Sequence, residues 1–265
     1  MATAIRATAI IAIAIVTATG AINTALAQTP FQTAQEFIES GQITEARRAL
    51  ESELKLRPDN LEARYNLAIL LQDIGHREES QRLYETNISM GRHLPSIINL
   101  ASLFQQQGQL DKAARLLESA TKQFKFEATP WYLLARLAEK RGEQTEAIRL
   151  FRKGLKADPL NGFAHLHYAD YQSRHGMKDF GLKNGARAVK LLSQCAPCWH
   201  TYGDILHRAK NNEESVSAYQ RSLAINPDNK TRQQLVIVLR ALGQNERADQ
   251  IQHGLDGHLK NSTDK

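Results

Sequence analysis

The chain of 265 residues lacks the features that usually identify an enzyme or a nucleic-acid-binding protein. It contains no phosphate-binding loop, nucleophile elbow or metalloprotease helix motif, so we expect no catalytic activity, no metal and no cofactor. The formal net charge is +6, which favours acidic partners, yet no run of Lys and Arg supports a nucleic-acid or heparin patch. Nucleic acid is therefore not expected among its partners.

Long apolar stretches are also scarce, and the clearest one lies at the N-terminus. Residues 7–16 are apolar and follow Arg6, and Ala25-Leu26-Ala27 is a small-x-small site before Gln28. This pattern predicts a bacterial secretory signal peptide over residues 1–27, cut after Ala27. An uncleaved anchor is the alternative, although the run is short for a membrane span. We expect a periplasmic or secreted protein with no integral membrane span after signal removal.

Glycine is sparse but regularly spaced. The steps between successive glycines are 34, 33, 34, 34 and 67 residues along the series Gly41, Gly75, Gly108, Gly142, Gly176 and Gly243. A fixed period in this range predicts an array of stacked structural repeats. Between the glycines, apolar residues recur at helical spacing, as in Trp131, Leu134, Ala135 and Ala138. Each unit therefore reads as a helix, a glycine turn and a second helix.

Proline supports this division, because all seven prolines fall near the ends of the units and none in the middle of a predicted helix. Residues 128–161 show the pattern best, with Trp131, Gly142, Ala147, Phe151 and Pro159 at fixed offsets. This unit resembles the tetratricopeptide repeat. The resemblance covers nearly all of residues 28–257.

The resemblance implies an all-α, right-handed superhelical solenoid of about seven stacked helical hairpins. The repeats span approximately residues 28–60, 61–93, 94–127, 128–161, 162–195, 196–229 and 230–257, and a polar tail follows at 258–265. Trp131 and Trp199 then belong to the packing rather than to a ligand platform. Gly181 and Gly185 lie inside the second helix of the fifth repeat, where they predict either a soft point or a tolerated feature of the stacking.

In such arrays the first helix of each repeat lines a concave groove. Carried onto this chain, the groove positions give the expected partner-binding residues Tyr132, Arg136, Lys140, Asp170, Arg174, His200, Asp204, His207 and Arg208. Lys140, Arg174 and Arg208 are 34 residues apart and should form a basic ladder. A ladder of this kind suits an acidic peptide segment or a chain-terminal carboxylate. The alternative is that Glu139, Asp170 and Asp204 neutralise the row.

Histidine and cysteine add two further hypotheses. His200, Asp204 and His207 share one helical face, which predicts either a zinc or copper site or an ordinary solvated face. The only two cysteines are Cys195 and Cys198, and a local disulfide of modest effect is expected in an oxidising compartment. A redox-active pair and a metal site with His200 stay open. Covalent haem does not fit, because Trp199 rather than His follows Cys198.

Taken together, the sequence predicts a non-catalytic scaffold or chaperone that binds a protein or peptide segment in its groove. An envelope-complex subunit would be of this kind. The alternative is a thiol-disulfide redox accessory protein that acts through Cys195 and Cys198 on a client held in the groove.

Overall fold

The computed structural model describes residues 29–252, and all statements below concern this part of the chain. The predicted signal peptide at residues 1–27 and the polar tail at 258–265 lie outside it. Helices account for nearly all of the described residues, and none of the described segments is a strand. The predicted all-α solenoid is therefore confirmed. No described helix has the length and apolar character needed to cross a membrane.

The helices follow one another in pairs. The first helices of the pairs are α1 (Pro30–Glu39), α3 (Leu61–Asp73), α5 (Leu94–Gln106), α7 (Ala128–Lys140), α9 (Gly162–Arg174), α11 (Ala196–Arg208) and α13 (Asn229–Ala241). The second helices are α2 (Ile43–Leu56), α4 (Arg77–Met90), α6 (Leu110–Gln123), α8 (Gln144–Ala157), α10 (Lys178–Leu191) and α12 (Asn212–Ile225). A further helical segment follows α13 from residue 245 to residue 252.

The turn inside each pair requires a left-handed residue. All six glycines of the periodic series have φ between 72° and 89°, a region that side chains with a Cβ rarely adopt. The pair α11–α12 has no glycine there, and Lys210 takes φ 67° instead. Lys210 is the only described non-glycine residue with positive φ. The glycine missing between Gly176 and Gly243 is thus replaced by a lysine in the same conformation.

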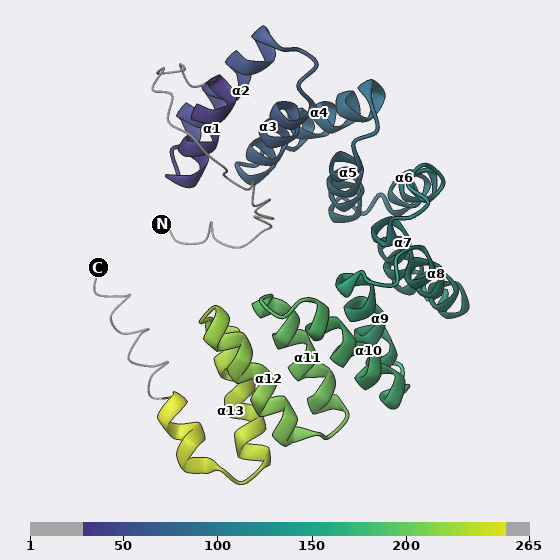
Figure 1. The fold of residues 1–265 in the computed structure, drawn as a ribbon, viewed down its shortest axis with the longest axis vertical. Coiled ribbons are helices and arrows are strands. Elements are labelled where there is room, and N and C mark those ends of the chain that lie inside the picture. The colour runs from purple at the N-terminus through teal and green to yellow at the C-terminus, as the bar shows by residue number, and fades with distance from the viewer. Residues whose placement is uncertain (1–28, 253–265) are drawn as a thin grey trace, which may run out of the picture.

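The pairs stack along a curved path from α1 at the purple end to α13 at the yellow end (Figure 1). Helix α9 packs on both α7 and α11, the corresponding helices of the neighbouring pairs, whereas second helices are not packed on one another in this way. Figure 1 shows α5 and α7 on the inner side of the curve and α6 and α8 on its outer side. The first helices therefore line the concave side.

Within the described residues, the apolar core falls into four clusters that follow one another along the stack. Its largest fully buried side chains include Tyr84, Phe151, Tyr171 and Tyr219. Phe151 stacks on Tyr168 with ring centroids 5.0 Å apart. Because each pair covers the apolar side of its neighbour, stability comes from the array rather than from one hairpin.

The two tryptophans lie at the edge of this packing. Trp131 is partly buried against the core, and Lys153 lies over its ring at 5.1 Å. Trp199 donates its indole N–H to the Ser193 carbonyl at 3.0 Å and contacts Tyr202 edge-on. Both rings are thus held by neighbouring groups of the same chain.

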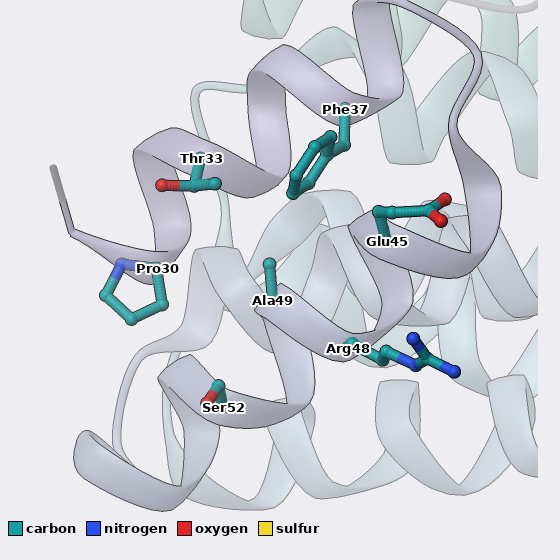
Figure 2. Close-up of a pocket in the computed structure, with 7 residues that line it drawn as sticks. All are labelled: Pro30, Thr33, Phe37, Glu45, Arg48, Ala49 and Ser52. Carbon is teal, nitrogen blue, oxygen red and sulfur yellow. The ribbon is translucent and has the colours of Figure 1, made fainter.

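The first pair has no neighbour before it within the described residues. Its exposed side is a hollow between α1 and α2, with Phe37 and Ala49 at its floor (Figure 2). In the fourth pair, which has neighbours on both sides, the residue equivalent to Ala49 is Leu150, and it is buried. The hollow is therefore the uncovered end of the stack.

Candidate functional site

The concave side of α7, α9 and α11 brings together most of the side chains predicted to bind a partner. These helices stack directly, so that residues 34 positions apart lie at the same height on successive helices. The side chains of Arg136, Lys140, Arg174 and Arg208 are exposed, and those of Asp170, Asp204 and His207 are half-buried. This is the candidate functional surface of the protein.

Two of the predicted residues lie in the packing instead. Tyr132 is 9% exposed and stacks on His167 of the next first helix, with ring centroids 4.7 Å apart. His200 is 8% exposed and its Nδ1 lies 2.8 Å from the Thr231 hydroxyl. Both occupy the fifth position of their repeat, where the next first helix covers the side chain. They support the groove but offer a partner little surface.

The predicted basic ladder is neutralised for two of its three members. Arg174 donates to Glu139 Oε2 at 3.2 Å and to Asp170 Oδ2 at 3.1 Å. Arg208 donates to Asp170 Oδ1 at 2.6 Å and to the Ser173 hydroxyl at 3.0 Å. The charges therefore alternate in sign from α7 to α11. For Glu139 and Asp170 this agrees with the alternative that acidic side chains neutralise the row. Asp204 takes no part in it, because it accepts a 2.6 Å hydrogen bond from Tyr219.

The pKa of Glu139 reflects this network. Partial burial acts to raise it, but hydrogen bonds and charge from Arg174 and His175 outweigh burial and lower the pKa below its usual range. Glu139 thus favours its ionised form more than a free carboxyl does, and its partners Arg174 and His175 tie the end of α7 to the end of α9. Each of these pairs is partly exposed, so each adds only modestly to stability.

Two cations at the end of α7 stay outside the network. Among the described residues, neither Arg136 nor Lys140 forms an ion pair. Lys140 donates only to the neutral side chain of Gln105, at 3.4 Å. Burial lowers the pKa of His167 to about 4, and the positive charge of Arg136 is the second cause of this shift. The positive charge available to a partner in the groove therefore belongs to Arg136 and Lys140.

The three side chains of the hypothesised metal site each have another partner. His207 pairs with Asn212 at 2.8 Å, and Asp204 and His200 have the partners given above. His200 Nε2 lies 3.6 Å from Asp204, a contact too long for a hydrogen bond. Across residues 29–252, no group of three or more His, Cys, Asp or Glu side chains could hold a metal ion.

Cys195 and Cys198 are joined by a disulfide at the first turn of α11. Cys198 is 1% exposed and packs with Leu166 and Ala188. Thiol-disulfide exchange needs access to a sulfur by an incoming thiolate. The burial of Cys198 leaves only the half-buried Cys195 open to such an attack, and the bond ties the N-cap residue of α11 to the first turn of the same helix.

The fold and the groove define a helical repeat protein whose first helices present a binding surface. Three stretches match family models for the tetratricopeptide repeat: residues 37–86, 98–162 and 196–229. The chain therefore belongs to the tetratricopeptide repeat proteins, whose fold serves as a scaffold for protein–protein interaction.

The chain is similar to several known proteins of this family. It is 29% identical over 129 residues to human tetratricopeptide repeat protein 7A. The matched stretch covers 48% of this chain and 15% of that protein. The match thus spans a small part of that relative. A tetratricopeptide repeat protein from Parabacteroides merdae has a TM-score of 0.60 at 16% identity, over 86% of this chain and 91% of that one.

Two other solved structures share the fold. The Cut9–Hcn1 hetero-tetramer of the APC/C gives a TM-score of 0.62 at 14% identity, over 80% of this chain and 42% of that chain. MamA from Desulfovibrio magneticus RS-1 gives 0.53 at 18% identity, over 64% of this chain and 96% of that one. At these identities the likeness shows the fold alone.

Proposed function

We propose that this protein is a non-catalytic scaffold that is exported to the periplasm and holds a segment of a partner protein in the groove of α7, α9 and α11. The observation that carries this proposal is the pair Arg136 and Lys140. These are exposed cations on the concave side that no described carboxylate neutralises. A desolvated acidic side chain or terminal carboxylate of a partner would find a charge-assisted hydrogen bond there.

The proposed partner segment carries its acidic group over the fourth repeat. Over the fifth and sixth repeats, the alternating row of Glu139, Arg174, Asp170 and Arg208 offers both donors and acceptors instead of one sign of charge. A segment of mixed polarity fits that row better than a wholly acidic one, because like charge beside Glu139 and Asp170 is unfavourable. Export rests on the signal-peptide pattern of residues 1–27.

Capture of partners from periplasmic extract by crosslinking tests this proposal. The parent is compared with Arg136→Glu/Lys140→Glu and with Arg221→Glu/Lys230→Glu, which carries the same change in net charge outside α7, α9 and α11. We expect one defined partner to be lost from the first variant and retained by the second. A partner captured equally by all three proteins would contradict a site at Arg136 and Lys140.

The redox alternative is less well supported by the geometry, because Cys198 is buried among apolar side chains. It differs from the scaffold in its prediction for function in the cell. Replacing both cysteines would then abolish function in the cell while partner capture persists.

A further inference from the structure

We propose that the outer face of α6, α8 and α10 docks on an anionic phospholipid surface. These three second helices carry eleven Lys and Arg against four Asp and Glu, whereas the whole chain has a net charge of +6. The excess positive charge of the protein is therefore concentrated on one stretch of its outer side. This surface is separate from the groove, and the proposal does not depend on a groove-bound partner.

The cations on this face are in register. Arg115, Arg149 and Lys183 follow one another at steps of 34 residues and form one row across the three helices. Lys122, Lys156 and Lys190 form a second row at the same steps. The rows lie seven residues apart along each helix, which is about 10 Å at 1.5 Å per residue. All six side chains are exposed. They make an area of positive charge rather than a single line.

The rows are much less neutralised than the row of cations in the groove. Of these six residues, only Arg149 forms an ion pair among the described residues, with Glu146. Between the rows on α8, Arg152 and Lys153 join Arg149 and Lys156 around a hollow beside Ile148. In the groove, Arg174 and Arg208 each face a carboxylate. The outer face therefore attracts a polyanionic partner more strongly than the groove does.

Exposed apolar side chains accompany these cations and favour a lipid surface over a soluble polyanion. Phe126 is 84% exposed and Leu160 is 68% exposed, and they lie in the turns that follow α6 and α8, shortly after the lysines of the second row. Phe180 is 64% exposed and lies three residues before Lys183, on the same side of α10. Cations beside single exposed apolar groups are typical of surfaces that meet anionic headgroups and insert side chains at the acyl boundary.

The orientation that follows is consistent with the fold. Because the second helices α6 and α8 lie on the outer side of the curve, a bilayer on that side would leave the concave side open (Figure 1). An acidic peptide would follow one row of cations and leave the other unused. A planar array of headgroups can contact both rows at once.

Vesicle co-sedimentation of the full chain tests this proposal. The probes are vesicles of phosphatidylglycerol mixed with phosphatidylcholine, and vesicles of phosphatidylcholine alone. The test variant is Arg115→Glu/Arg152→Glu/Lys183→Glu, with one change on each helix and none at an ion-paired residue. The matched control is Arg77→Glu/Arg221→Glu/Lys230→Glu, which changes the net charge equally. All proteins share residues 1–28, so any contribution of that segment is common to them.

We expect the parent and the control to bind anionic vesicles in low salt and to be released in high salt. The partition coefficient of the test variant should fall by about tenfold or more, because each cation near an anionic surface adds to binding. Circular dichroism establishes that each variant is folded. Equal binding of test variant and control, or no preference for anionic vesicles, would overturn the proposal.

A second variant separates lipid from other polyanions. Phe126→Ser/Leu160→Ser keeps every charge and should weaken vesicle binding while leaving binding to polyglutamate and to DNA unchanged. Vesicle binding that is unchanged in this variant would overturn the role of the apolar groups. Tight binding of polyglutamate or DNA by a parent that ignores vesicles would assign the face to an acidic protein or a nucleic acid instead.

Discussion

Gly185 of α10 lies directly against the ring of Tyr202 on α11, so close that a Cβ at residue 185 would come within 2.6 Å of Tyr202 Cδ2. Gly181, one turn earlier, lies against the backbone of α9, where a Cβ would meet the Ala169 carbonyl at 3.1 Å. The two glycines therefore permit close packing on both sides of α10. Of the two expectations for these glycines, close stacking fits the structure better than a soft point in the helix.

This contact predicts the effect of Gly185→Ala. Helix propensity alone would stabilise the protein by about 1 kcal/mol. Overpacking against Tyr202 should outweigh that gain and leave a net loss of about 1–3 kcal/mol in the free energy of unfolding. Urea denaturation measures it. In a Tyr202→Ala background the same change should cost much less, and an equal cost in both backgrounds would refute the contact as its cause.

Lys210 offers the opposite test. It holds the left-handed turn that glycine holds elsewhere, at a cost of about 1–2 kcal/mol for a residue with a Cβ. We expect Lys210→Gly to raise the free energy of unfolding by up to about 1 kcal/mol, since glycine loses more entropy on folding. The reciprocal change Gly176→Lys should destabilise the protein. A loss of stability in Lys210→Gly would contradict the strained turn.

His167 predicts a dependence of stability on pH. Burial against Tyr132, followed by the charge of Arg136, lowers its pKa from 6.5 to about 4 in the folded protein. The unfolded chain therefore binds more protons between these two values, and stability falls as pH decreases from about 6.5 toward 4. The loss from this residue between pH 7.5 and pH 5 is about 1–2 kcal/mol.

The measurement is the free energy of unfolding at several pH values for the parent and for His167→Phe, which keeps an aromatic ring beside Tyr132. The variant should show a flatter slope between pH 5 and pH 7. Parallel curves for the two proteins would mean that His167 is protonated as easily in the folded state as in the unfolded one.

The disulfide predicts a structural effect and not a functional one. Cys195→Ala/Cys198→Ala opens a loop of only a few residues, which the chain-entropy relation values at about 2 kcal/mol. We expect an earlier melt and unchanged capture of the partner by the folded variant. Unaltered stability together with a loss of function in the cell would favour the redox alternative.

The repeat architecture was predictable from the sequence because it rests on local rules. Glycine marks each left-handed turn, and proline avoids helix interiors, so spacing alone placed the hairpins. The turn at Lys210 does not follow from the sequence in the same way, because a lysine gives no sign of positive φ. Only its position 33 residues before Gly243 could have suggested it.

Side-chain partners were less predictable. The positions of Arg174 and Arg208 followed from the period, but their pairing with Glu139 and Asp170 depends on how far neighbouring helices are offset. The burial of Tyr132 and His200 depends on the same offset. The rows on α6, α8 and α10 were visible in the period of 34 residues. Their shared exposure on the outer side depends on how the second helices stack, which the spacing alone does not give.

Site-specific photo-crosslinking tests the central claim, that the concave side holds the partner, most directly. A photoreactive amino acid is placed at exposed Phe163 on α9, at exposed Arg208 on α11 or at exposed Gln220 on α12, and crosslinks are identified by mass spectrometry. The account predicts the same partner protein at 163 and 208, with no crosslink to it at 220. Crosslinks from 220 alone would contradict the account, because they would place the partner outside the groove.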